Sequence, residues 1–246
     1  MGWALGWALT GAGCGVVADP ARLASIEEGR LFGAELIGDL GALPNEYLHW
    51  FYYRREALAA GGSGRGAFLA EQQARFYSCC PADPSSALDA WNATRLEREQ
   101  TYGAANRAAA GGFERAETDL VSGGYEGVAL AIMRAIARDE PSTLILNTPN
   151  AARLAELPDD AVIEAPCRVD GSGVHPLPQS PLPAHARGLM TTVKQVERWT
   201  IEAATTGSAA AARLALTHHP LVDSAAVASA LLADYRAAFG ELDYLR

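Results

Sequence analysis

Residues 157–178 read LPDDAVIEAPCRVDGSGVHPLP, and this stretch decides the fold class. Its segment AVIEAPCRVD (161–170) is predicted to be a strand, and DGSG (170–173) has the composition of a turn. The VHPLP segment that follows is predicted to lie extended at a sheet edge, because proline cannot donate a hydrogen bond in a central strand. A second apolar run, STLILNT (142–148), is predicted to be another strand. The sequence therefore predicts a small sheet.

Helical patterns fill most of the remaining chain. In the predicted helix at 183–206, Leu189, Val193 and Val196 recur at three- and four-residue spacing. The last helix is marked in the same way by Val227, Leu231, Tyr235 and Phe239. Further helices are predicted at about 20–29, 33–41, 45–60, 66–78, 85–109, 124–140 and 208–217. We predict one α+β domain over residues 1–246, with a small sheet beneath many helices.

Composition excludes several classes of function. The net charge of −9 argues against nucleic acid, because phosphate contacts need clustered basic residues. Lys194 is the only lysine, and the arginines that supply the other basic residues suit bidentate binding of carboxylate or phosphate. No stretch has about 20 consecutive apolar residues, which predicts no membrane span. The four cysteines show no zinc spacing, so we expect reduced thiols and a cytoplasmic protein.

The stretch LPNEYLHWFYYRR (43–55) contains five of the chain's nineteen aromatic residues. Asn45 is predicted to cap a helix that opens at Glu46, which places Tyr47 in the first turn. Free amides and the helix dipole favour an anionic side chain there, so Tyr47 is a candidate base. The alternative from the residues alone is that Tyr47 is one more packed aromatic. The face predicted to meet the core contains Leu48, Phe51, Tyr52 and Arg55.

Several common motifs are missing from the chain. The glycine-rich stretches GAGCGV (11–16) and GGSGRG (61–66) follow no predicted strand, so neither forms a dinucleotide-binding fingerprint. The sequence also contains no nucleophile elbow, no zinc-protease motif and no P-loop. The histidines are scattered, and His218 and His219 are predicted to close a helix.

Five blocks in order resemble the family 4 glycosidases. They are LPNEY (43–47), ILNTPN (145–150), the opening stretch 157–178, GLMTTVKQVERWTIEAATTGS (188–208) and HPLVDSAAVASALL (219–232). The resemblance implies an NAD- and manganese-dependent enzyme acting on 6-phospho-α- or 6-phospho-β-glucosides, here predicted to be a 6-phospho-β-glucosidase. It also implies a fold like the C-terminal domain of lactate and malate dehydrogenases, without the N-terminal nucleotide-binding domain. Residues 1–15 are then a remnant of the link to that domain.

The resemblance also assigns roles to two residues. In this family NAD removes hydride from C3 of the sugar, a metal polarises the oxygens at C2 and C3, and a tyrosine takes the C2 proton before the aglycone leaves. That tyrosine corresponds to Tyr47. A family arginine that holds the 6-phosphate corresponds to Arg65, where a glycine-rich turn at a helix start suits phosphate on physical grounds too.

Departures from the family pattern concern the cofactors. Where family members read N-H-L-G-W with a metal-binding histidine, this sequence has Trp3 and Ala4 before Leu5-Gly6-Trp7. The resemblance therefore leaves no metal ligand and no NAD-binding residue in this chain, and we expect the chain alone to be inactive. A non-catalytic paralogue that binds a sugar phosphate and serves assembly is the alternative, and a homo-oligomer is expected in both cases. Asn150-Ala151-Ala152 replaces the family's frequent N-N-G, which puts the geometry of that loop in question.

Overall fold

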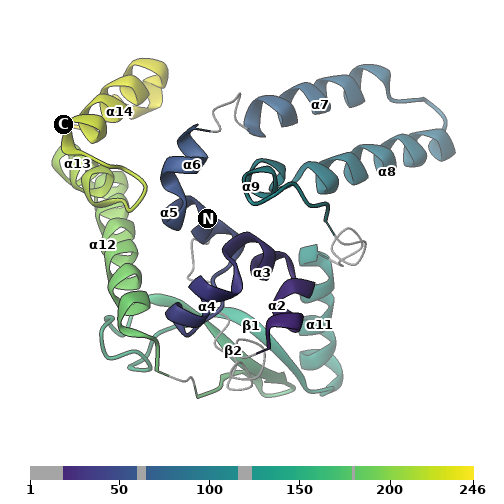
Figure 1. Cartoon of the computed structure of the whole chain (residues 1–246), viewed down its shortest axis with the longest axis horizontal. Helices are drawn as coiled ribbons and strands as arrows, with labels where there is room; N and C mark the ends of the chain where they lie inside the picture. Colours follow the sequence, from purple (N-terminus) through teal and green to yellow (C-terminus); the bar gives the residue numbers. More distant parts are fainter. Residues whose placement is uncertain (1–18, 60–64, 116–123, 179–180) are drawn as a thin grey trace.

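The computed structural model describes residues 19–59, 65–115, 124–178 and 181–246 (Figure 1). Its sheet has three antiparallel strands in the order β1 (Ser142–Pro149), β2 (Val162–Asp170) and β3 (Gly173–Pro176). Cys167 in the central strand pairs with Leu144 on one side and with Pro176 on the other. The predicted strands, turn and edge segment are confirmed to within a few residues, and Pro176 lies on the edge strand.

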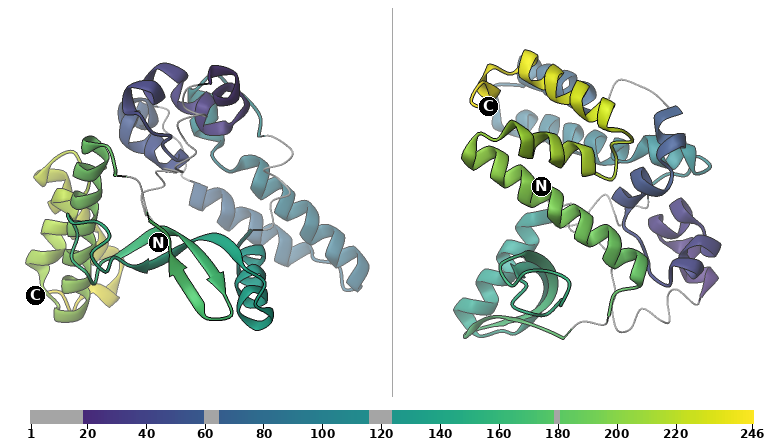
Figure 2. Two further views of the ribbon diagram at one scale, coloured as in Figure 1. Left: turned by 90° about the horizontal axis from the view of Figure 1, so that it is seen from below. Right: turned by 90° about the vertical axis from the view of Figure 1, so that its left-hand side faces the viewer.

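The two faces of the sheet differ in burial, as the two-residue period of a strand requires. On the face toward the core, Ile163, Ala165 and Cys167 are buried and pack with Met190. The opposite face is open to solvent, and Ile145 on it is 64% exposed. Helix α11 (Gly124–Arg138) packs against β1 and β2, as Figure 2 shows in its left view.

A layer of three helices follows the sheet. These are α12 (Ala184–Thr206), α13 (Ala209–His218) and α14 (Ala225–Ala238), which lie side by side in the right view of Figure 2. Gly207 ends α12 at a φ of 76°, a left-handed conformation that glycine adopts without strain. The last predicted helix is confirmed as α14. Of the residues that mark it, Val227, Tyr235 and Phe239 are exposed.

The N-terminal part of the described chain consists of short helices. These are α2 (Pro20–Ser25), α3 (Glu27–Phe32) and α4 (Ala34–Leu40), so the single helix predicted at 20–29 is wrong. Ile26 interrupts it with an extended backbone, and the break lets Leu23 and Leu31 pack in one cluster.

Two other predicted helices are also interrupted. The helix predicted at 85–109 is split into α8 (Pro84–Thr101) and α9 (Ala104–Ala109), because Gly103 is left-handed at a φ of 66°. The helix predicted at 45–60 is split into the 3-10 helix η1 (Glu46–Leu48), α5 (His49–Tyr52) and α6 (Arg54–Ala59).

The change of helix type at the start of this segment rotates its faces. As a result Phe51 and Arg55 are exposed, contrary to prediction, and His49 is buried in their place. The His49 ring stacks on Tyr53 at 4.9 Å between centroids, and burial lowers the pKa of the imidazole. Among the described residues, no helix is both long enough and apolar enough to cross a membrane.

Helix α7 (Arg65–Cys79) and α8 form an antiparallel hairpin that extends from the rest of the molecule (Figure 1). Asp83 caps α8 by accepting a hydrogen bond of 2.9 Å from the amide of Ser86. The chain closes with the short 3-10 helix η2 (Gly240–Leu242). The open ends of the hairpin helices, which hold Arg65 and Thr101, lie toward α9 and the segment around Tyr47.

Candidate functional site

Tyr47 lies in the first turn after Asn45, as the sequence predicts. The side-chain oxygen of Asn45 accepts a hydrogen bond of 3.1 Å from the Tyr47 amide, so the cap sets the start of η1. The Tyr47 side chain is 42% exposed. Part of the residue is therefore accessible to solvent.

The Tyr47 hydroxyl forms a hydrogen bond with the hydroxyl of Tyr102, which is the residue directly after α8. Fifty-five positions separate the two tyrosines in the sequence. Tyr102 belongs to no motif, so sequence reasoning missed it. The only signal is the dipeptide Tyr102-Gly103, a plausible helix end that says nothing about a partner.

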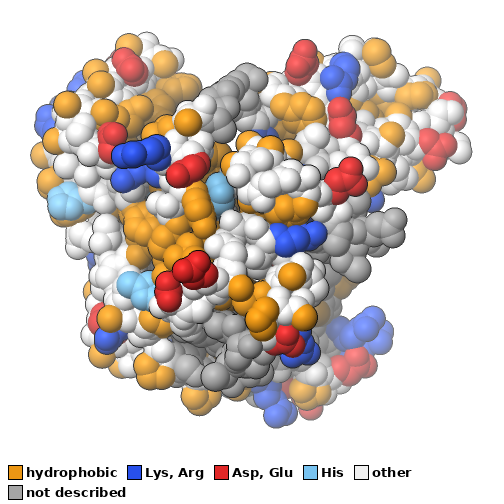
Figure 3. Space-filling model, viewed as in Figure 1, with side chains coloured by type: hydrophobic (Ala, Val, Ile, Leu, Met, Phe, Trp, Pro, Cys, Tyr) orange, Lys and Arg blue, Asp and Glu red, His pale blue; other side chains and the backbone are white. Residues whose placement is uncertain are grey.

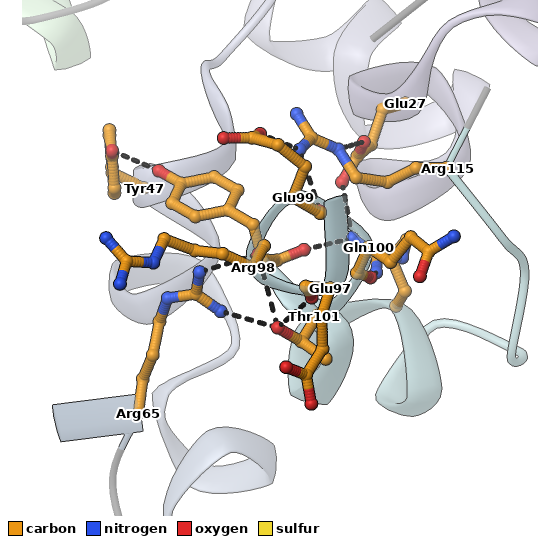
Figure 4. A network of polar contacts seen from close by, with 11 residues as sticks. Glu27, Tyr47, Arg65, Glu97, Arg98, Glu99, Gln100, Thr101 and Arg115 are labelled. Carbon is orange, nitrogen blue, oxygen red and sulfur yellow. Dashed lines mark hydrogen bonds and ion pairs between the residues drawn. The ribbon is translucent and has the colours of Figure 1, made fainter. Parts of the chain in front are cut away.

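Arg65 is the first residue of α7 and lies on the other side of Tyr102. Its guanidinium carbon is 5.0 Å from the centroid of the Tyr102 ring, a cation–π distance. Its Nη2 donates a hydrogen bond of 2.9 Å to the carbonyl oxygen of Arg98, and Nη1 lies 3.5 Å from the hydroxyl of Thr101 (Figure 4). The structure thus brings Tyr47 and Arg65 to the same tyrosine.

The nearby carboxylates are engaged by other arginines. Glu27 and Glu99 lie 3.5 and 3.1 Å from the guanidinium of Arg115, and Glu27 also lies 3.4 Å from Arg107. Within the described ranges Arg65 forms no ion pair with a carboxylate. Glu99 acts on Arg65 only at longer range, so the guanidinium can still pair with an external anion.

Charge and burial shape this site in two ways. Burial lowers the pKa of the Arg65 guanidinium, and an arginine remains charged after such a shift. Burial, followed by the hydrogen bond with Tyr47, raises the pKa of Tyr102 far above that of an ordinary phenol. Tyr102 therefore keeps its proton at neutral pH. The site thus combines a guanidinium that forms no close ion pair among the described residues with an exposed phenol, that of Tyr47, which is hydrogen-bonded to Tyr102.

The loop after β1 contains two alanines, Ala151 and Ala152, at the positions where the family often has asparagine and glycine. Ala151 and Ala152 adopt left-handed backbone conformations, at φ values of 43° and 63°. Buried Asn150 organises the loop, because its side chain donates to the carbonyl oxygens of Leu154 and Leu157 at 2.9 Å each.

Side chains that could ligate a metal are not clustered in the described part of the chain. No group of three or more His, Cys, Asp or Glu side chains in this part of the chain is arranged to hold a metal ion. Cys79, Cys80 and Cys167 are free thiols. Trp3, Ala4 and Cys14, like the glycine-rich turn before Arg65, lie outside the described residues.

Comparison with known proteins places these features in context. Residues 10–222 match the sequence model of the family 4 glycosyl hydrolase C-terminal domain. A probable 6-phospho-beta-glucosidase of Bacillus subtilis is 36% identical over 108 residues, which are 44% of this chain and 24% of that protein. The 6-phospho-beta-glucosidase BglT of Thermotoga maritima is 39% identical over 97 residues, covering 39% of this chain and 23% of BglT. A 6-phospho-alpha-glucosidase of Leptotrichia buccalis is 34% identical over 103 residues, covering 42% and 23%.

Solved structures show the same relationship over more of the chain. The Thermotoga maritima 6-phospho-beta glucosidase with manganese, NAD+ and glucose-6-phosphate matches with a TM-score of 0.55 and 25% identity, covering 92% of this chain and 48% of that one. A second crystal form of that enzyme, with NAD and glucose-6-phosphate, matches with a TM-score of 0.61 and 24% identity over the same shares. The chain therefore spans less than half of the solved enzyme.

Proposed function

Because this chain belongs to the family 4 glycosyl hydrolases, through their C-terminal domain, we propose that it serves a 6-phospho-glucosidase as the part that binds the sugar phosphate and removes a proton. The proposal is based mainly on the contacts that Tyr47 and Arg65 both make with Tyr102: Tyr47 through a hydrogen bond and Arg65 through a cation–π contact. The proposed substrate is a phosphorylated disaccharide or glucoside. The β anomer is favoured, because the two 6-phospho-β-glucosidases above are more similar to this chain than the α-glucosidase is.

Arg65 is proposed to bind the 6-phosphate. Its Nη1 contact with Thr101, at 3.5 Å, is at the limit of a hydrogen bond and can be exchanged for a phosphate oxygen. The bond from Nη2 to the Arg98 carbonyl holds the guanidinium in place during that exchange. A planar, permanently charged group held in this way suits a phosphate better than a lysine would.

Tyr47 is proposed to accept a proton from the sugar. Its phenol is hydrogen-bonded to the same Tyr102 whose ring the Arg65 guanidinium contacts, so a sugar held by its phosphate at Arg65 is proposed to present a carbon to Tyr47. The solved relatives hold NAD and manganese, which are the cofactors of the family. The described residues do not form a site for the metal, so the proposal is confined to phosphate binding and proton removal.

The organisation of the protein follows from the same family membership. We propose that residues 1–246 form one domain of the C-terminal type, with the likeness to the dehydrogenases expected above and with residues 1–15 as the link to a nucleotide-binding domain. We propose a homo-oligomer in the cytoplasm, without nucleic acid or membrane as a partner. Hydrophobic side chains gather between α12 and α5 on the face shown in Figure 3, which supports assembly.

Calorimetry with glucose 6-phosphate tests the proposal directly. We expect the 246-residue chain to bind glucose 6-phosphate more tightly than unphosphorylated glucose. Arg65→Ala should lower the affinity for glucose 6-phosphate by about tenfold or more, the size of one charge-assisted contact. Arg134→Ala on α11, where the side chain is exposed, is the matched control and should change nothing. Equal affinity for glucose and glucose 6-phosphate would overturn the assignment.

Turnover separates the enzyme from the non-catalytic alternative. We expect no cleavage of a nitrophenyl 6-phospho-β-glucoside by this chain alone with NAD and Mn²⁺, because the described residues offer no metal cluster. If the chain is part of an enzyme, fusing it to a family nucleotide-binding domain and introducing Ala4→His should produce activity. Tyr47→Phe in that fusion should abolish the activity. A fusion that binds the sugar phosphate and NAD but stays inactive would favour a paralogue that only binds and assembles.

A further inference from the structure

Tyr102 is held on several sides, whereas its partner Tyr47 is at the surface. The Tyr102 ring lies between two guanidinium groups, with the carbon of Arg65 at 5.0 Å and that of Arg115 at 5.2 Å from its centroid. Its backbone carbonyl accepts a hydrogen bond from the buried Arg107. The ring therefore has a fixed place at the end of α8.

The direction of the hydrogen bond follows from the surroundings of the two phenols. Tyr102 is partly buried and its pKa is raised, first by burial and then by Tyr47, so Tyr102 is the member that keeps its proton. Tyr47 is more exposed, so we assign its oxygen as the acceptor in this pair. Three charged groups act on Tyr102: Glu46 raises its pKa, Arg115 lowers it, and Arg65 interacts with it electrostatically.

We infer that Tyr102 is a positioning residue for the proposed base: its hydroxyl donates a hydrogen bond to the Tyr47 oxygen, orients it toward the sugar and stabilises its phenolate form. The inference rests on the proposed function in one respect, the role of Tyr47 as the base. Arg65 and Arg115 contribute by holding the ring in place through their cation–π contacts. The residue that binds phosphate and the residue that removes a proton are thus linked through a single side chain.

The experiment follows Tyr47 itself and needs no turnover. Tyrosines labelled with ¹³C at the ring carbon that bears oxygen are titrated by NMR, and the Tyr47 signal is assigned by its loss in Tyr47→Phe. In Tyr102→Phe, which keeps a ring between the arginines, we expect the Tyr47 pKa to rise by about one unit, the size of one hydrogen bond to a charged group. The reciprocal variant Tyr47→Phe should lower the pKa of Tyr102. A tyrosine with only a packing role would change neither value.

Controls keep this result separate from the proposed function. Tyr77→Phe, where the side chain is 76% exposed on α7, should leave the Tyr47 pKa unchanged. If Tyr102→Phe unfolds the chain, the reciprocal shift in Tyr47→Phe decides, and an unchanged Tyr102 pKa there overturns the inference. An unchanged Tyr47 pKa in a folded Tyr102→Phe variant, with glucose 6-phosphate binding intact, overturns this inference alone. Failure of glucose 6-phosphate binding with both shifts present overturns the proposed function but not the tyrosine pair.

Discussion

The buried side chain of Gln72 joins the two helices of the hairpin, because its Nε2 donates a hydrogen bond of 2.7 Å to Glu97 Oε2. The same nitrogen lies 3.0 Å from the carbonyl oxygen of Thr94, and Oε1 accepts from Arg98 Nε at 3.2 Å. Every polar group of this amide is therefore satisfied across the α7–α8 contact. The hairpin begins at Arg65 and ends directly before Tyr102, so Gln72 helps to hold the two sides of the candidate site in register.

Gln72→Leu should therefore destabilise the chain. The variant leaves the Arg98 Nε donor and the Thr94 carbonyl without their partner, and we expect the free energy of unfolding to fall by about 1–3 kcal/mol. Denaturant unfolding followed by circular dichroism measures it. Gln73→Leu, at the exposed neighbouring position, is the control and should stay within about 0.5 kcal/mol of wild type. Equal stability of the two variants would show that the hairpin does not depend on the amide.

Replacing a strained alanine should stabilise the chain. Ala152 has a φ of 63°, a region that costs a residue with a Cβ about 1–2 kcal/mol and costs glycine little. Glycine also raises the conformational entropy of the unfolded chain, which favours unfolding by about 0.4–1 kcal/mol and offsets part of the benefit. We therefore expect Ala152→Gly to raise the free energy of unfolding by about 0.5–1 kcal/mol. Ala155→Gly, in the same loop but outside the left-handed region, should not stabilise, and a gain at both positions would refute the strain argument.

The turn between β2 and β3 should make stability depend on acid. Hydrogen bonds from the hydroxyl and amide of Ser172 lower the pKa of Asp170 to about 2. A carboxyl with a depressed pKa stabilises the fold above its unfolded pKa of about 4, and this contribution is lost as the pH falls through about 2. We expect the unfolding free energy to fall between those two values. Asp170→Asn should flatten the fall, and an identical pH profile in the variant would assign the acid sensitivity to other groups.

The sequence predicts the sheet well because its signals are local. The turn composition at 170–173 and the short apolar segments of β1 and β2 can be recognised without knowing any partner. The helix breaks depend on side-chain contacts that form only in the fold. Helix α8 ends where the Arg107 guanidinium donates hydrogen bonds to the carbonyl oxygens of Gln100 and Tyr102. In the sequence, Arg107 is an ordinary residue near the end of a predicted helix and gives no sign of that role.

In the candidate site, too, some residues can be predicted from the sequence and one cannot. Tyr47 and Arg65 belong to blocks that resemble the family, so their importance can be predicted, although their roles stay predictions. Tyr102 acquires its place only when the end of α8 meets the segment around Tyr47. The sequence does not indicate this pair, because the two tyrosines lie in different elements and share no motif.

Self-association through α12 is the last prediction. Ile201 lies on this helix with 61% of its surface exposed, beside α13 and α14 with further exposed apolar side chains. An apolar face of this kind favours contact with a second copy, because its burial removes apolar surface from water. In sedimentation velocity at micromolar concentration we expect wild type to associate and Ile201→Asp to shift toward monomer. Leu130→Asp on α11, where the side chain is 63% exposed, is the matched control and should associate like wild type. A monodisperse wild-type monomer would contradict assembly, and an equal effect of both variants would place the contact elsewhere than on α12.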